Sequence, residues 1–322
     1  MAVKTIERRH KVFQFSRDDP PAAEVEPGEL VLVETTDSLD GQIDVSRPGK
    51  IDLGPGNGTT VDPGRALPLT GPIAVRGAAP GDVLAAEIVG LVATGNAFIL
   101  PEFGELLATA GAMEEQWAAR VVELKRGKIQ LTETLQLPYN FMVGCLGVAP
   151  AAAPADTPTP GDYGGNHDCI HFGQRSALYL QVQVPGALVS LGDVHAAMGD
   201  GESAGTAVEC DGEVLLRFRL YPGRSIPGPV LETEAEWMVF GHGPTTDEAI
   251  AMAKHRAIDL LMRRLAVTRG DAYMVLAAVG HLRLNETVNP NCSARVEIPK
   301  YVADPLLWLG AEEPAAQREL AL

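Results

Sequence analysis

Two short segments hold most of the residues in this chain that could do chemistry. Residues 165–168 and 192–202 together contain three Asp, one Glu and two His among glycines. Both segments interrupt the most apolar, strand-like part of the sequence. A carboxylate buried in such a region must be paired, hydrogen-bonded or bound to a metal. The sequence therefore predicts a polar site inside a β-rich core.

Asp193 and His195 are separated by one residue, a spacing that suits a strand or a tight loop. Side chains at positions i and i+2 of a strand project to the same face. Carboxylate and imidazole are good ligands for a divalent transition metal such as zinc. The alternative is an Asp–His hydrogen-bonded pair that closes a turn, and the spacing alone leaves both readings open.

Asp200 and Glu202 repeat the same spacing after one glycine. They form either a solvated turn or, beside a second acidic cluster, a place for a general base. Asp168 is a stronger candidate ligand than His167 or His171. Those two histidines would share a face only in a helix, and the neighbouring glycines oppose a helix there.

Three further residues are weaker candidates when each is taken alone. Glu34 and Asp37 end an early apolar strand, where polar side chains usually form turns. Cys169 is either a nucleophile or a small buried residue. The chain has no P-loop, no Gly-x-Ser-x-Gly elbow and no His-Glu-x-x-His motif, which argues against nucleotide enzymes and the common hydrolase classes.

The chain contains 34 glycines and 24 prolines, which favour many short strands over long helices. We therefore expect short strands to position these residues. Alternation predicts a strand at 178–184, and apolar runs predict others at 30–34, 83–88 and 187–191. Asp211-Gly212 predicts a hairpin turn. Two helices are expected late in the chain, with capping residues at Thr245 and Thr268.

A single domain over residues 1–322 is the simplest organisation, of the class mainly β with a few late helices, a β-rich α+β fold. The Ala/Pro-rich segment 149–165 is expected to be a long irregular loop within that domain. The helices are expected at 245–280.

Composition limits the classes of partner. The chain is 46% apolar and 21% charged, with 42 acidic and 26 basic residues and a net charge of −16. This charge repels nucleic acid and anionic membranes, so neither is an expected partner. The four cysteines form no close pair, and the sequence shows neither a signal-peptide core nor a membrane-spanning apolar run. We expect a cytoplasmic protein.

Taken together, these segments resemble the acetamidase/formamidase family. The resemblance extends over roughly residues 10 to 300, and its most specific block is Gly-Asp-x-His-Ala-Ala-x-Gly-Asp-Gly-Glu at 192–202. The supporting blocks are Glu34-x-x-Asp37 with Gly-Gln-Ile at 41–43, Leu-Thr-Gly-Pro-Ile at 69–73, Gly-Ala-Ala-Pro-Gly-Asp at 77–82, Gly-Gly-Asn-His-Asp at 164–168, Val-Pro-Gly-Ala at 184–187, Thr-Thr-Asp-Glu-Ala at 245–249 and Asp-Ala-Tyr at 271–273.

The resemblance implies hydrolysis of a short amide, of the formamide or acetamide type, to a carboxylate and ammonia. It also implies a β-rich fold, a homodimer or higher homo-oligomer, and a divalent metal, zinc or else calcium. We interpret the matching positions as two sets. The metal set is Asp37, Asp168, Asp193, His195 and Asp200, and the catalytic set is Glu202 as the base acting on a metal-activated water, Asn166 toward the substrate, and Glu34 as the alternative base.

The chain departs from the family pattern at a few places. His167 and Cys169 flank Asp168, and His281 stands where an acidic residue would be more typical. Two other functions remain open at this point. One is an amidase with Cys169 as its nucleophile, and the other is a metal-stabilised protein that binds a small ligand without turning it over.

Overall fold

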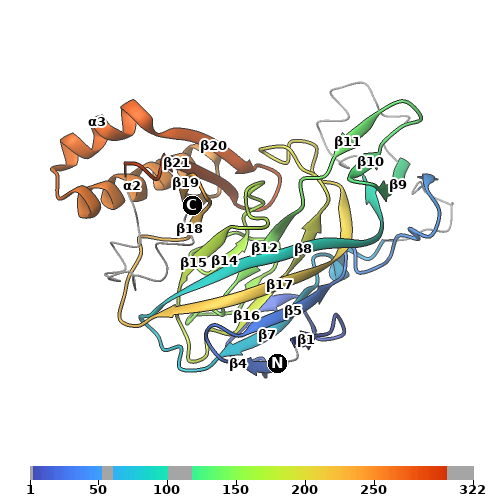
Figure 1. The fold of residues 1–322 in the computed structure, drawn as a ribbon, viewed down its shortest axis with the longest axis horizontal. Coiled ribbons are helices and arrows are strands. Elements are labelled where there is room, and N and C mark those ends of the chain that lie inside the picture. Colours follow the sequence, from blue (N-terminus) through green and yellow to red (C-terminus); the bar gives the residue numbers. More distant parts are fainter. Residues whose placement is uncertain (1–2, 53–60, 101–117, 303–322) are drawn as a thin grey trace.

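The computed structural model describes residues 3–52, 61–100 and 118–302. Strands dominate this part of the chain (Figure 1). The strands are β1 (Lys4–Ile6), β2 (Lys11–Val12), β3 (Gln14–Phe15), β4 (Ala23–Val25), β5 (Leu30–Thr35), β6 (Gly49–Asp52), β7 (Leu69–Val75), β8 (Val83–Ile99), β9 (Ala118–Lys125), β10 (Lys128–Gln130), β11 (Gln136–Pro138), β12 (Met142–Gly147), β13 (Ala155–Asp156), β14 (Gly164–Asn166), β15 (Ala177–Gln181), β16 (Val189–His195), β17 (Glu209–Tyr221), β18 (Val230–Glu232), β19 (Glu236–Gly243), β20 (His281–Glu286) and β21 (Cys292–Pro299).

The two longest strands, β8 and β17, cross the middle of the molecule side by side (Figure 1). β17 pairs antiparallel with β8 and also with β5. Its buried Val214, Leu216 and Phe218 alternate with partly exposed neighbours, as the sequence predicts. These side chains enter the main apolar core of the strand-rich part, so burial of one face positions the strand.

Two helices pack beside the hairpin of β20 and β21, at one end of the molecule (Figure 1). They are α2 (Thr246–Leu265) and α3 (Arg269–Val279). The predicted capping is confirmed, because Thr245 accepts a hydrogen bond from the Glu248 amide and Thr268 accepts one from the Asp271 amide. A second apolar core lies between these helices, β19 and β21.

The hairpin turn predicted at Asp211-Gly212 is wrong. Both residues lie inside β17, and the pairing with β8 shifts register between Cys210 and Asp211. A Cβ on Gly212 would clash with the side chain of Val194. The glycine therefore permits close packing of strands here, which is an alternative reason for glycine in a strand.

The other expected elements differ at their ends. The strand predicted at 178–184 is the shorter β15, and the strand predicted at 83–88 continues to Ile99 in β8. The Ala/Pro-rich segment 149–165 is mostly irregular, but Gly164 and Gly165 at its end belong to β14, and Ala155 and Asp156 form β13 by pairing with β3. Prolines on either side limit this strand to two residues.

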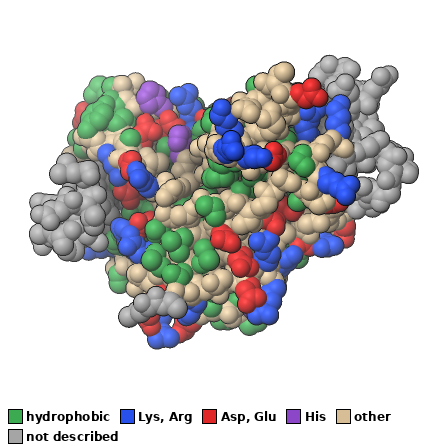
Figure 2. Space-filling view, turned by 45° about the vertical axis from the view of Figure 1, so that its right-hand side comes forward, with side chains coloured by type: hydrophobic (Ala, Val, Ile, Leu, Met, Phe, Trp, Pro, Cys, Tyr) green, Lys and Arg blue, Asp and Glu red, His purple; other side chains and the backbone are tan. Residues whose placement is uncertain are grey.

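Surface charge and helix hydropathy limit which molecules the protein can contact. On the face drawn in Figure 2, Asp and Glu side chains lie interspersed with Lys and Arg and form no single acidic patch. Among the described residues, no helix is long and apolar enough to cross a membrane.

β16 is an interior strand, and this position determines where the site lies. It pairs with β12, with β7 and, at its end, with β17. All seven of its residues are buried. The polar end of β16, with Asp193 and His195, is therefore enclosed by neighbouring strands.

Candidate metal and catalytic site

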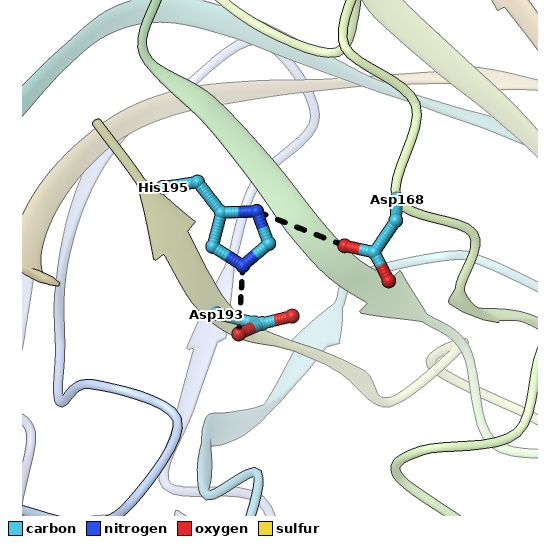
Figure 3. A group of neighbouring side chains, drawn as sticks. All are labelled: Asp168, Asp193 and His195. Carbon is cyan, nitrogen blue, oxygen red and sulfur yellow. Dashed lines mark hydrogen bonds and ion pairs between the residues drawn. The ribbon is translucent and has the colours of Figure 1, made fainter. Parts of the chain in front are cut away.

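The predicted pair on β16 is brought together with Asp168. His195 Nε2 lies 3.2 Å from Asp193 Oδ1, and His195 Nδ1 lies 3.8 Å from Asp168 Oδ1. The imidazole stands between the two carboxylates (Figure 3). Ligand atoms of all three residues lie within 4.8 Å of one another, and all three side chains are buried. This spacing is small enough for one cation to contact all three.

Gly144 on β12 makes room for these carboxylates. Its neighbours Val143 and Cys145 pair with Val194 and Gly192, so Gly144 lies opposite Asp193. The Asp168 amide donates to the Gly144 carbonyl at 3.2 Å. A Cβ at Gly144 would clash with a carboxylate oxygen of both Asp168 and Asp193. Any side chain here would fill the space between the two acids.

A second group shares the same imidazole. His195, Glu202 and Glu209 also place ligand atoms within 4.8 Å of one another, and all are buried. Glu209 begins β17 directly opposite His195, and its Oε2 lies 3.3 Å from Nε2. The sequence analysis missed Glu209. Its signal is a lone acidic residue inside the apolar run 207–210.

His195 and its two neighbouring carboxylates, Asp193 and Glu209, shift the pKa values of one another. Burial alone would lower the pKa of His195, but Glu209 and Asp193 outweigh it and raise that pKa well above its usual value. Burial would raise the pKa of Glu209, yet His195, the Ala207 amide and the Ser38 side chain lower it. His195 Nε2 and Glu209 Oε2 lie 3.3 Å apart, so each side chain favours the charged form of the other.

For the remaining carboxylates, burial outweighs the attraction of His195. Burial, followed by repulsion from Glu202 and Asp193, raises the pKa of Asp168 well above its usual value. Burial also raises the pKa of Asp193 despite the attraction of His195. The pKa of Glu202 rises to about 8, again chiefly through burial. The cluster thus needs protons or a cation to offset its negative charge.

Several buried polar atoms support a cation at this place. Among the described residues, these atoms have no hydrogen-bond partner: both carboxylate oxygens of Asp168, Nδ1 of His195, Oε2 of Glu209 and Oδ1 of Asn166. An unpartnered buried oxygen is costly unless something binds it. Oxygen and imidazole donors suit a divalent metal of the zinc type. The residues present therefore fit a metal ion.

Three other predicted residues lie outside these two groups. One oxygen of Asp37 accepts from the amides of Leu39 and Gly41, as a turn-forming Asp does. Both oxygens of Asp200 bind Arg295, at 2.8 and 3.0 Å. The Glu34 carboxylate lies 3.9 Å from Arg8. The segment 34–40 still borders the cluster, because Ser38 hydrogen-bonds Glu209.

The residues around Asp168 have different surroundings. Asn166 on β14 is buried. His167 is also buried and hydrogen-bonds Ser293 Oγ at 2.7 Å, while burial lowers its pKa to about 3. Cys169 is buried, and burial raises the pKa of its thiol to about 11. Because the thiolate is the reactive form, this environment disfavours Cys169 as a nucleophile.

A further acidic residue reaches the same region from β20. Glu286 is fully buried, and its Oε2 accepts from the amides of Val288 and Asn289. Its Oε1 has no partner among the described residues. Burial raises the pKa of Glu286 to about 7, and its charge raises the pKa of Glu202. Sequence analysis missed it, because only the fold brings β20 beside the loop of Glu202.

Comparison with known proteins gives consistent matches. The model of the Acetamidase/Formamidase family matches residues 4–152 and 97–304. The crystal structure of an acetamidase from Bacillus halodurans superposes with a TM-score of 0.85 at 30% identity, over 95% of this chain and 100% of that one. The formamidase of Methylophilus methylotrophus is 26% identical over 303 residues, 72% of this chain and 71% of the relative.

A relative from Schizosaccharomyces pombe is 27% identical over 261 residues. That match spans 63% of this chain and 62% of the length of the relative.

Proposed function

Because the chain belongs to the acetamidase/formamidase family, we propose that it hydrolyses short carboxylic amides of the formamide or acetamide type. The products are a carboxylate and ammonia. The names of the Methylophilus methylotrophus and Bacillus halodurans relatives support this substrate class. The observation in the chain itself that carries the proposal is the buried cluster around His195, in which carboxylates outnumber positive charges.

We assign Asp168, Asp193 and His195 as the residues that would hold a divalent cation. A nitrogen donor among them favours zinc over calcium, which takes six to eight oxygen ligands. When bound, such an ion supplies Lewis-acid polarisation of the amide carbonyl and lowers the pKa of water toward about 7. The proposed ligand set omits Asp37 and Asp200, because their carboxylates are engaged by backbone amides and by Arg295.

Glu202 is the proposed base. It takes a proton from the attacking water and returns it to the departing nitrogen, so that ammonia leaves as the C–N bond breaks. It is the most exposed carboxylate of the two groups, at 7%, which suits the side from which water and substrate arrive. Its pKa of about 8 already includes the attraction of His195, and a bound cation would lower it further toward neutrality, where a general base works best.

Asn166 is proposed to orient the substrate. Its unpartnered atom is the side-chain oxygen, which is an acceptor. The NH₂ group of a primary amide offers two N–H donors, so one of them can satisfy this oxygen. This role suits the observed atom better than donation to a developing oxyanion.

The remaining expectations are part of the same proposal. Self-association is supported by the exposed apolar residues Tyr273, Met274 and Leu282 on α3 and β20. Light scattering coupled to gel filtration would show whether the protein is a homodimer or larger. We also propose, from the sequence, that the protein is cytoplasmic. The small molecule that it binds is the amide substrate.

The decisive experiment is ammonia release from formamide, acetamide and propionamide. One preparation would be assayed as isolated, after chelation, and after adding zinc back, with bound metal measured throughout. We expect chelation to lower the rate by about 100-fold or more and zinc to restore it.

Two results would contradict parts of the proposal. Full activity after complete metal removal would eliminate the metal and direct attention to Cys169. No ammonia release from folded, metal-loaded protein would eliminate hydrolysis of these amides and favour the binding protein without turnover.

A further inference from the structure

The hairpin of β20 and β21 is hydrogen-bonded to the loop that carries Glu202. The Gly201 amide donates to the Asn285 carbonyl at 2.9 Å, and Thr287 Oγ1 donates to the Gly201 carbonyl at 3.0 Å. Gly201 also forms an isolated bridge with Glu286. Both polar groups of the Gly201 backbone are therefore used by residues more than eighty positions later in the chain.

Arg295 on β21 reinforces this contact through its side chain. Its guanidinium binds both oxygens of Asp200, at 2.8 and 3.0 Å, and Asn285 Oδ1 at 2.7 Å. Its Nε donates to Glu297 at 2.8 Å. The Arg295 side chain is fully buried, whereas the side chain of Asp200 is 32% exposed. A buried guanidinium requires such partners, and its planar fork fits a carboxylate in one orientation.

We propose that Arg295 is a positioning residue for catalysis, which acts through Asp200 and Asn285 to hold Glu202 beside His195. The inference rests on the proposed function. Asp200 and Asn285 lie on the two sides of the Gly201 contact, so one side chain fastens both the loop and the strand it meets. The hairpin of β20 and β21 thereby supports the loop that carries the proposed base.

The backbone of Glu202 explains why such support is needed. Its φ is 42°, in the left-handed region that residues other than glycine rarely adopt. A loop in this conformation persists only when its surroundings impose it. Release of Asp200 would let Glu202 relax and move its carboxylate away from the reacting atoms.

Activity measurements on substitutions of both partners test the proposal. Arg295→Gln and Asp200→Asn are each expected to lower kcat by about 10- to 100-fold with little change in KM, because a small misplacement of a catalytic group has that effect. Arg295→Lys should fall between these variants and the wild type, since an ammonium lacks the fork. Asp200→Asn also serves if Arg295→Gln does not fold, because it leaves Arg295 paired with Glu297.

A double-mutant cycle separates positioning from general stability. In a Glu202→Gln background, Arg295→Gln should cause little further loss of kcat, because both changes remove the same contribution. The control is Arg217→Gln, which removes three hydrogen bonds from a partly exposed arginine to Glu87, between β17 and β8. It should lower the melting temperature and leave kcat unchanged.

Three outcomes would overturn the proposal. They are full kcat in folded Arg295→Gln, a kcat loss that multiplies with that of Glu202→Gln, or an equal kcat loss in Arg217→Gln. Amide hydrogen exchange gives a test that does not need activity. Exchange over residues 199–205 should quicken in Arg295→Gln and not in Arg217→Gln. If the wild type hydrolyses no amide, the proposed function fails, and unchanged exchange would then also overturn the role of Arg295.

Discussion

His195 stands among four buried carboxylates, and one imidazolium cannot neutralise them all. It pairs most strongly with Glu209, whose pKa falls, while the pKa values of Asp168, Asp193 and Glu202 rise. The difference follows from local contacts, because Glu209 also accepts from Ala207 and Ser38. Asp168 has no hydrogen bond to either oxygen from any described residue, so it has most to gain from a cation.

Gly144 gives a test at the scale of one residue. Gly144→Ala would place a methyl group against the carboxylates of Asp168 and Asp193. We expect it to abolish tight metal binding and to lower amide hydrolysis by about 100-fold or more, because the two acids must move apart. The measurement is metal bound per chain after dialysis, together with ammonia release.

Gly90→Ala is the matched control for that substitution. Gly90 lies in β8, and a Cβ there would meet Leu215 at 3.6 Å, an ordinary contact. The control should bind metal as the wild type does. A Gly144→Ala protein with normal metal content would contradict the proposed ligand set.

The strands around the site fix the backbone conformation of its acidic residues. Asp168, Asp193 and Glu202 all have positive φ, at 47°, 60° and 42°. Such conformations are uncommon for acidic residues and gather at functional sites. Here they turn three carboxylates from a loop, a strand and a second loop toward one imidazole. The strands β12, β16 and β17 hold these segments in place.

The helices α2 and α3 lie outside this arrangement and act as scaffold, which predicts a separation of stability from activity. Thr245→Ala removes the hydroxyl that caps α2 and should lower the free energy of unfolding by about 1 kcal/mol. We expect a lower urea midpoint with an unchanged kcat/KM. Thr245→Ser keeps the hydroxyl and should restore the midpoint; a large loss of activity in Thr245→Ala would show that α2 does more than support β21.

For the whole molecule, the buried acids couple folding to pH. Burial raises the pKa of Asp37 to about 6, of Glu286 to about 7 and of Glu202 to about 8. The folded state therefore binds protons that the unfolded state has already lost above about pH 4 to 4.5. Their contribution to stability is complete below that pH and is lost as pH rises through 6, 7 and 8. Two groups act oppositely: Glu209 below its ordinary value of 4.5, and His167, whose lowered pKa adds stability as pH rises through the ordinary histidine value of about 6.5; the three raised carboxyl pKa values outnumber them above about pH 5.

We accordingly expect metal-stripped protein to melt at a lower temperature as pH rises from about 5 to about 8, by about 5 °C or more. Zinc should reduce this dependence, because a cation takes the place of the protons and binds better when the ligands are deprotonated. Calorimetry of stripped and zinc-loaded protein across this range measures both effects. A melting temperature of stripped protein that rises over this range would show that the cluster is already neutralised in another way.

The sequence by itself was sufficient for the family, the β-rich class, the late helices with their Thr caps, and the proximity of Asp193 and His195. These depend on local patterns, since alternation, capping and i, i+2 spacing act within a few residues. The sequence also identified Asp168 and Glu202 as members of a polar site. It misjudged Asp211-Gly212, because the same dipeptide can turn a chain or allow close strand packing.

Only the tertiary structure decided which acids meet. Glu209 faces His195 through strand pairing, Gly144 leaves the space between Asp168 and Asp193, and Glu286 and Arg295 arrive from a hairpin near the other end of the chain. It also showed that Asp200 is hydrogen-bonded to Arg295. The physical reason is that ligation and desolvation depend on distances of a few ångströms between segments far apart in sequence, and no local pattern encodes those distances.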